Sequence, residues 1–131
     1  MTEAEFIDKW VGTPWLERGD SIHGIDCWAL VVEFYRDVYG IELENNYLAD
    51  IVSGYEQEVK KWNPDDNGLV FMCYEDGKPL HVGVVVGGGM FVLHARGCVK
   101  NGVHEGAVAC DRMSVMKRRY KDMRFYNYKG M

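Results

Sequence analysis

The sequence lacks an apolar run long enough to cross a membrane, and it lacks the charge balance of a nucleic-acid-binding protein. A spanning helix needs about 20 consecutive apolar residues, and no stretch of the 131 residues approaches that length. The formal net charge is −5, whereas binding to a phosphate backbone calls for a basic surface. We therefore expect neither a membrane span nor a nucleic-acid partner.

The N-terminus also lacks the features of a secretion signal. Residues 1–5 include two glutamates, and no apolar segment follows them. We therefore expect synthesis in the cytoplasm, with delivery by another component if the protein acts elsewhere. The sequence shows no repeats, low-complexity tracts or linkers, so residues 1–131 are predicted to form a single domain.

Disulfide and metal frameworks are similarly missing. Four cysteines occur at irregular spacings, without a CxxC pair: Cys27, Cys73, Cys98 and Cys110. In a chain without a secretion signal, this pattern disfavours a disulfide framework. A mixed site built from His94, Cys98, His104 and Cys110 is a weak alternative, because zinc modules space their ligands more tightly. We therefore expect no metal and no cofactor.

The sequence does contain a change of pattern, from helical periodicity to short strands. Helices are predicted over residues 3–10, 27–39 and, more weakly, 47–61. Strands are predicted over residues 69–74, 80–86, 90–95, 106–110 and 123–128. Helices followed by an antiparallel sheet are typical of the α+β class.

Cys27 occupies a position suited to a nucleophile. It is at the first turn of the most strongly predicted helix, whose apolar positions include Leu30, Val31 and Phe34 and which ends at Gly40. Unpaired N–H groups and the positive end of the helix dipole favour a thiolate there. The alternative interpretation is a small thiol that fills the core.

Two histidines flank a predicted hairpin turn at residues 87–89. A turn centred between Gly87 and Gly88 places His81 directly opposite His94, with Cβ atoms roughly 4.5–5.5 Å apart. A turn centred on Gly88 instead places the two imidazoles on opposite faces. Gly83 beside His81 leaves room for another backbone, and the helix start that carries Cys27 is one candidate.

Together these residues have the composition of a thiol hydrolase site. Cys27 would be the nucleophile, His81 the general base, and His94 the group that holds His81 in the useful tautomer. His23 precedes Cys27 by four residues and could compete as the base, but we expect it in a surface loop. Residues 117–119 and Lys121 form a basic cluster, interpreted either as a docking patch or as a solvated face.

Four segments resemble the NlpC/P60 family of cell-wall peptidases, in the family's order and at about its spacing. They are GTPW at residues 12–15, GIDCWALV at 24–31, HVGV at 81–84 and FVLHA at 91–95. The resemblance covers roughly residues 10–112. The Asp-Cys-Trp variant preceded by Gly-Thr-Pro-Trp looks most like the phage and prophage branch associated with tail tips.

The resemblance implies a papain-like fold, in which helices including the nucleophile's pack on a small antiparallel sheet. It also implies a Cys–His–His triad of Cys27, His81 and His94. The usual substrate is the stem peptide of bacterial peptidoglycan, often cut after γ-linked D-glutamate. The backbone N–H of Cys27 would then donate to the oxyanion.

The same resemblance places Trp15, Asp26 and Trp28 in the substrate and oxyanion region. Trp15 stands where many members have tyrosine, and Trp28 where many have serine. The leading hypothesis is a peptidoglycan peptidase carried on a phage tail, with peptidoglycan and tail proteins as partners. The alternatives are a tail assembly protein that has lost useful catalysis, and another thiol-dependent amidase or acyltransferase.

Overall fold

The structure, a computed structural model, describes residues 1–44 and 47–131 and combines helices with an antiparallel sheet. The helices are α1 (Glu3–Trp10), α2 (Cys27–Phe34), α3 (Leu48–Ser53), α4 (Tyr55–Glu58) and α5 (Met113–Arg119). The strands are β1 (Asp20–Ser21), β2 (Gly24–Ile25), β3 (Trp62–Pro64), β4 (Val70–Glu75), β5 (Lys78–Val86), β6 (Phe91–Lys100), β7 (Val103–Arg112) and β8 (Asp122–Tyr128). The predicted α+β class is confirmed.

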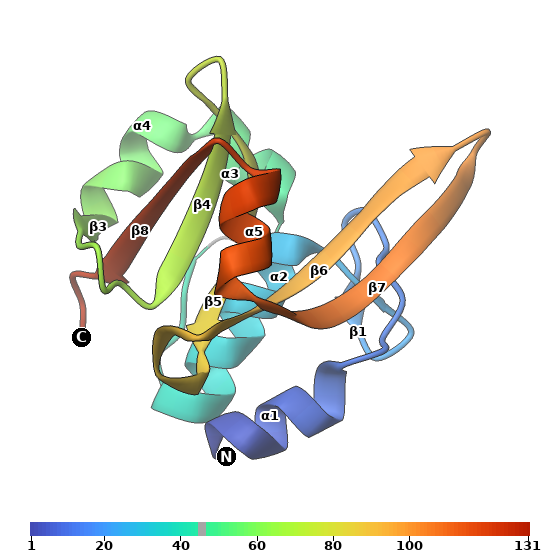
Figure 1. The fold of residues 1–131 in the computed structure, drawn as a ribbon, viewed down its shortest axis with the longest axis horizontal. Helices are drawn as coiled ribbons and strands as arrows, with labels where there is room; N and C mark the ends of the chain where they lie inside the picture. The colour runs from blue at the N-terminus through green and yellow to red at the C-terminus, as the bar shows by residue number, and fades with distance from the viewer. Residues whose placement is uncertain (45–46) are drawn as a thin grey trace.

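The main sheet separates two layers of helix. Its strand order over the described residues is β3-β8-β4-β5-β6-β7, and each neighbouring pair is antiparallel. In Figure 1, α2 lies behind the sheet and α5 in front of it, while the β6–β7 hairpin extends away from the other strands. The sheet therefore has an α2 face and an α5 face.

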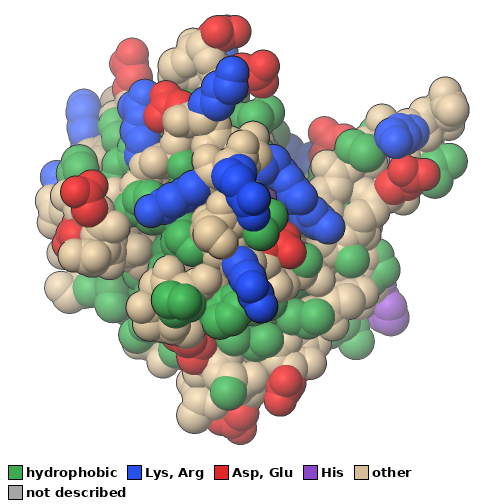
Figure 2. Space-filling model, viewed as in Figure 1, with side chains coloured by type: hydrophobic (Ala, Val, Ile, Leu, Met, Phe, Trp, Pro, Cys, Tyr) green, Lys and Arg blue, Asp and Glu red, His purple; other side chains and the backbone are tan. Residues whose placement is uncertain are grey.

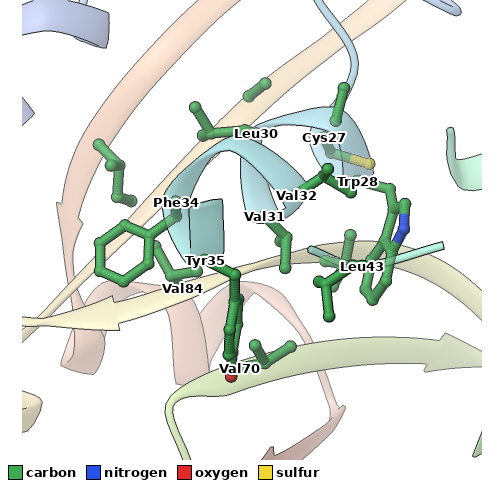
Figure 3. Close-up of a cluster of buried hydrophobic side chains, with 14 of the residues drawn as sticks. Cys27, Trp28, Leu30, Val31, Val32, Phe34, Tyr35, Leu43, Val70 and Val84 are labelled. Atoms are coloured by element: carbon green, nitrogen blue, oxygen red, sulfur yellow. The ribbon is translucent and has the colours of Figure 1, made fainter. Parts of the chain in front are cut away.

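The α2 face carries most of the buried apolar surface. Leu30, Val31 and Phe34 are fully buried, and they pack in one cluster with sheet residues that include Val70 and Val84. Figure 3 shows these side chains around α2, with Tyr35 pointing towards Val70. Burial of such side chains stabilises a fold by roughly 1.5–3 kcal/mol each.

The α5 face holds a second and smaller cluster. Because successive strand residues point to opposite faces, Phe71 and Cys73 of β4 turn away from α2. They pack with Val92 of β6 and with Met116 of α5, all of them fully buried. The sequence analysis did not predict α5, although its apolar residues at positions 113 and 116 are three apart.

The predicted helix over residues 27–39 is confirmed with one change of geometry. α2 ends at Phe34 and continues as a π-helical turn over Tyr35–Tyr39. Gly40 then ends the segment with a φ of 68°, a left-handed conformation that favours glycine. The predicted helix over residues 47–61 is broken at Gly54 into α3, α4 and a 3-10 turn over Val59–Lys61.

Neither predicted register of the β5–β6 hairpin is observed: the one that places His81 opposite His94 is off by two residues, and the one that places them on opposite faces is off by one. Val84 pairs with Leu93 and Val86 with Phe91, because Gly87–Gly89 form a 3-10 turn that takes up more chain than a two-residue turn. His81 and His94 are therefore not direct cross-strand partners. A shift of two residues preserves the faces, so both imidazoles still lie on the α5 face, in a diagonal relation.

The expectation that Gly83 makes room for the Cys27 helix is also wrong. A Cβ atom on Gly83 would lie 2.7 Å from the carbonyl oxygen of Leu93 and 2.7 Å from the ring of Phe71. The space that glycine leaves is thus occupied by β6 and by the Phe71 side chain. Gly83 permits the close packing of three strands on the α5 face.

Candidate active site

Asp26 fixes the start of α2. Its Oδ1 accepts a hydrogen bond from the N–H of Trp28 at 2.9 Å, which caps the helix. The same oxygen accepts from the N–H of Leu48 at 2.9 Å, which anchors the start of α3. Asp26 is buried. The sequence analysis assigned it to the substrate region, and in the structure its carboxylate positions the two helix starts beside the cleft.

A cleft of about 480 Å³ opens where β5 and β6 diverge. The two strands pair over Val84–Val86 and Phe91–Leu93. Beyond those pairs, the cleft is lined by residues from the segment before β1, from the start of α2 and from both strands: Trp15, Asp26, Cys27, His81, Ala95 and Gly97. The proposed nucleophile and the proposed base therefore face the same space.

The two predicted histidines are joined by a hydrogen bond. Nε2 of His81 lies 2.7 Å from Nδ1 of His94. His94 is fully buried and His81 is nearly so. The other ring nitrogen of His81, Nδ1, takes no part in this hydrogen bond.

Asp111 of β7 extends this chain. Its Oδ2 lies 2.7 Å from Nε2 of His94, and it lies 3.9 Å from Nη1 of Arg96. Because a carboxylate only accepts hydrogen bonds, Nε2 of His94 carries the proton. Nδ1 of a neutral His94 then accepts from Nε2 of His81, so Nδ1 of His81 has a free lone pair.

The sequence analysis did not connect Asp111 with the two histidines. A signal existed in Asn101-Gly102, a dipeptide typical of a two-residue hairpin turn. Both residues have a positive φ, and the turn pairs Lys100 with Val103. Continued along the strands, that register pairs His94 with Ala109 and places Asp111 two residues further on the same face.

Burial keeps the resting thiol and imidazole neutral. Burial raises the pKa of Cys27 far above its usual range, and the negative charge of Asp26 adds to this, although nearby backbone N–H groups, including that of Val82, oppose it. Burial, followed by the neighbouring His94 and by Arg119 and Arg96, lowers the pKa of His81 to about 3. The expected thiolate is therefore not the favoured resting form, and a thiol proton must be transferred as the reaction proceeds.

The far end of the hydrogen-bond chain is charged. Burial lowers the pKa of His94 despite the opposing effect of Asp111, so His94 is neutral at pH 7. Burial acts to raise the pKa of Asp111, but the hydrogen bond from His94 and the charges of Arg96 and Arg119 outweigh it and lower the pKa. Asp111 is thus a carboxylate that faces neutral imidazoles.

Trp15 forms one wall of the cleft. Its ring lies against Gly97, where a Cβ atom would approach it to 2.5 Å, and it packs against His104 with ring centroids 5.4 Å apart. The N–H of Trp15 donates to the carbonyl of Gly106, which ties this loop to the edge of β7. Trp15, predicted to lie in the substrate and oxyanion region, lines the same cleft as Cys27.

Trp28 lies elsewhere than the sequence analysis expected. Its side chain is 1% exposed and packs edge to face on Trp62 with ring centroids 5.8 Å apart. Since side chains at consecutive helix positions point in different directions, Trp28 points into the core while Cys27 lines the cleft. The indole belongs to the apolar cluster of the α2 face, so its placement in the substrate region is corrected.

The remaining candidates are at the periphery. His23 is exposed in the loop between β1 and β2, as expected. His104 is exposed on β7. Over residues 1–44 and 47–131, no group of three or more His, Cys, Asp or Glu side chains is arranged to hold a metal ion. In the same part of the chain, no helix is long and apolar enough to span a membrane.

The predicted basic cluster is a surface feature of α5. Residues 117–119 form the last turn of this helix, and Lys121 follows it. Figure 2 shows Lys and Arg side chains gathered on this face of the molecule, in the region where Figure 1 places α5.

Comparisons with known proteins agree on the family. The NlpC/P60 family matches residues 12–125. "Tail tip assembly protein K" of Escherichia phage N15 is 31% identical over 125 residues, which cover 85% of this chain and 51% of the relative. "Probable endopeptidase NlpC homolog" of Haemophilus influenzae is 33% identical over 92 residues, which cover 70% of this chain and 46% of the relative.

A solved structure supports the same fold. The NlpC/p60 domain of the peptidoglycan hydrolase SagA superposes with a TM-score of 0.59 at 17% sequence identity, covering 94% of this chain and 92% of that one. At this identity the likeness concerns the fold alone. The chain spans about half the length of the curated relatives it matches. On the extent of the family match, the chain belongs to the NlpC/P60 family.

Proposed function

We propose that this protein is a cysteine peptidase that hydrolyses amide bonds in peptidoglycan stem peptides, with Cys27 as the nucleophile. The observation that carries the proposal is that Cys27 and His81 line one cleft, while His81 is held by His94 through a 2.7 Å hydrogen bond. Membership of the NlpC/P60 family supports the choice of substrate.

In the first half of the reaction, His81 acts as a general base. The Sγ–H of Cys27 transfers its proton to Nδ1 of His81 as the sulfur bonds to the amide carbonyl carbon. The resulting imidazolium then protonates the leaving amine, the C–N bond breaks, and an acyl-enzyme thioester remains on Cys27. Because the resting pair is neutral, attack and proton transfer are coupled.

The oxyanion of the tetrahedral intermediate needs a hydrogen-bond donor. The first N–H groups of a helix have no intrahelical partner, and the N–H of Cys27 is the first of α2. It can donate to the oxyanion, and the positive end of the helix dipole favours the negative charge. In the second half, Nδ1 of His81 takes a proton from water as the water oxygen attacks the thioester carbonyl carbon. The C–S bond then breaks, the acid is released, and the proton passes from His81 to Sγ of Cys27.

The test is digestion of purified muropeptides, with products identified by mass spectrometry. The wild type should release stem-peptide fragments at one amide bond, and Cys27→Ala should release none. Cys98→Ala is the matched control, because Cys98 is an exposed cysteine on β6 outside the site, and it should retain wild-type activity. Equal products from Cys27→Ala, or none from the wild type, would refute the proposal.

Tail assembly is a second candidate function. It is favoured by the similarity to a relative named "Tail tip assembly protein K". The two functions are compatible if a tail carries the peptidase to the wall, which would also place the protein in the virion. A Cys27→Ala phage that still forms complete tails but enters cells poorly would separate the catalytic role from the assembly role.

A further inference from the structure

Three buried or partly buried polar side chains form a continuous chain behind the thiol. His81 contacts His94 at 2.7 Å, and His94 contacts Asp111 at 2.7 Å. The side chain of His94 is inaccessible to solvent, and that of Asp111 is 25% exposed. Both contacts are short for hydrogen bonds between nitrogen and nitrogen or oxygen. The arrangement on strands β5, β6 and β7 fixes the order of the three groups.

The carboxylate of Asp111 determines which ring nitrogen of each histidine carries a proton. If His94 presented an unprotonated Nε2 to the carboxylate, two acceptors would face each other at 2.7 Å, which is repulsive. His94 must therefore be protonated at Nε2 and, when neutral, unprotonated at Nδ1. That nitrogen can only accept, so His81 must be protonated at Nε2 and unprotonated at Nδ1.

We infer that Asp111 is a positioning residue of this site, which sets the tautomer of His81 through His94 and so presents a lone pair to the thiol of Cys27. This inference rests on the proposed function. Among the described residues, the His94 ring makes hydrogen bonds to His81 and Asp111, and Asp111 is the partner that can only accept, so its loss removes the group that selects the tautomer of His94. The wrong tautomer of His94 would turn a donor towards His81 and favour a His81 that already carries a proton at Nδ1.

Asp111 also has an electrostatic role once the proton has moved. His81 becomes an imidazolium in a buried position, close to His94 and to the cations Arg96 and Arg119, which disfavour its charge. Cys73 lies opposite it on β4, and Tyr120 stacks on its ring with centroids 5.8 Å apart. Asp111 is the carboxylate joined to it by hydrogen bonds, through His94, and it offsets part of that charge.

The inference is tested first on the wild type, by two-bond ¹H–¹⁵N correlation NMR of the imidazole rings at pH 7. The expected spectrum shows Nε2 protonated and Nδ1 unprotonated in both His81 and His94. A His94 protonated at Nδ1 would overturn the inference without any variant. Because the readout needs no substrate, it stands apart from the failure of the proposed function, which would appear as an inactive wild type.

Asp111→Leu replaces the carboxylate acceptor with an apolar side chain of similar size. Asp122→Asn is the control, because it changes an exposed carboxylate on β8. We expect mixed tautomers of His81 and His94 in Asp111→Leu. Its kcat for muropeptides should fall by roughly 10- to 100-fold, as when an outer partner of a metal-binding histidine is lost, with KM within about 2-fold. The control should match the wild type in both readouts. Unchanged tautomers in a folded Asp111→Leu would contradict the inference.

Discussion

The two faces of the sheet differ in what they bury. The α2 face is packed with large apolar side chains such as Leu30 and Phe34. The α5 face buries two imidazoles next to a smaller apolar cluster that includes Phe71 and Met116. Buried polar groups contribute little net stability even when they are satisfied. The comparison suggests that the α2 face supplies most of the stability, while the α5 face holds the groups proposed for chemistry.

The largest expected effect is on activity, from a change on the α5 face. His81→Gln keeps an N–H donor for His94 but removes the base, so kcat should fall by about 10³- to 10⁴-fold, equivalent to roughly 4–5.5 kcal/mol. The free energy of unfolding should change by less than about 1 kcal/mol. Muropeptide turnover and urea unfolding measure the two quantities. A large loss of stability in His81→Gln would show that the α5 face contributes to stability as much as the α2 face does.

The next effect is on stability, from a change on the α2 face. Phe34 is fully buried and packs edge to face on Phe6 with ring centroids 5.0 Å apart. Phe34→Ala should reduce the free energy of unfolding by about 3–5 kcal/mol, because it leaves a cavity. Activity per folded molecule should be retained at a temperature where the variant is still folded. If Phe34→Ala lost as much activity as His81→Gln, the two faces would not differ in their contribution to catalysis.

A smaller effect concerns pH. Because His81 has a pKa lowered to about 3 in the fold, the unfolded state binds a proton below about pH 6.5 and the folded state does not. Stability is therefore lost as the pH falls, by roughly 1.4 kcal/mol per unit, or about 2 kcal/mol from pH 6.5 to 5. His81→Gln should flatten this slope in urea unfolding curves. An equal slope in both proteins would contradict the assignment of a buried neutral imidazole.

The smallest effect concerns the ring that covers His81. Tyr120 stacks on His81 with an interplanar angle of 20°. Tyr120→Ala removes the stack and should destabilise the fold by about 0.5–1.5 kcal/mol, whereas Tyr120→Phe keeps the ring and should change stability by less than about 0.5 kcal/mol. Thermal unfolding of the two variants compares them directly. Equal losses would mean that the hydroxyl, not the stacked ring, matters.

The sequence predicted the elements better than the contacts between them. The helix that starts at Cys27 and the strands that carry His81 and His94 follow from local patterns. The two-residue shift between those strands did not, because three consecutive glycines allow several turns. The position of Asp111 next to His94 depends on the register of the β6–β7 hairpin, which the Asn101-Gly102 turn specifies. The predicted strand over residues 106–110 ended one residue before Asp111, so the contact was missed.

The direction of a side chain from a helix start proved harder to predict. Trp28 and Cys27 are adjacent, and the burial of Trp28 in the core, where it packs on Trp62, 34 positions later, accompanies the placement of Cys27 in the cleft. The neutral state of the thiol also depends on tertiary burial, which a helix-dipole argument leaves out. Family resemblance pointed to Cys27, His81 and His94, while their charge states and the contact of Asp111 with His94 depend on tertiary packing.

The role of Cys27 as nucleophile is tested most directly by trapping an acyl-enzyme. The protein would be mixed with a γ-D-glutamyl p-nitrophenyl ester, quenched in acid, and each cysteine-containing peptide weighed by mass spectrometry. We predict an acyl adduct on Cys27 within the first turnover, none on Cys73, Cys98 or Cys110, and no adduct on Cys27 in His81→Gln. An unmodified Cys27, or acylation of the exposed Cys98 at the same rate, would contradict the account.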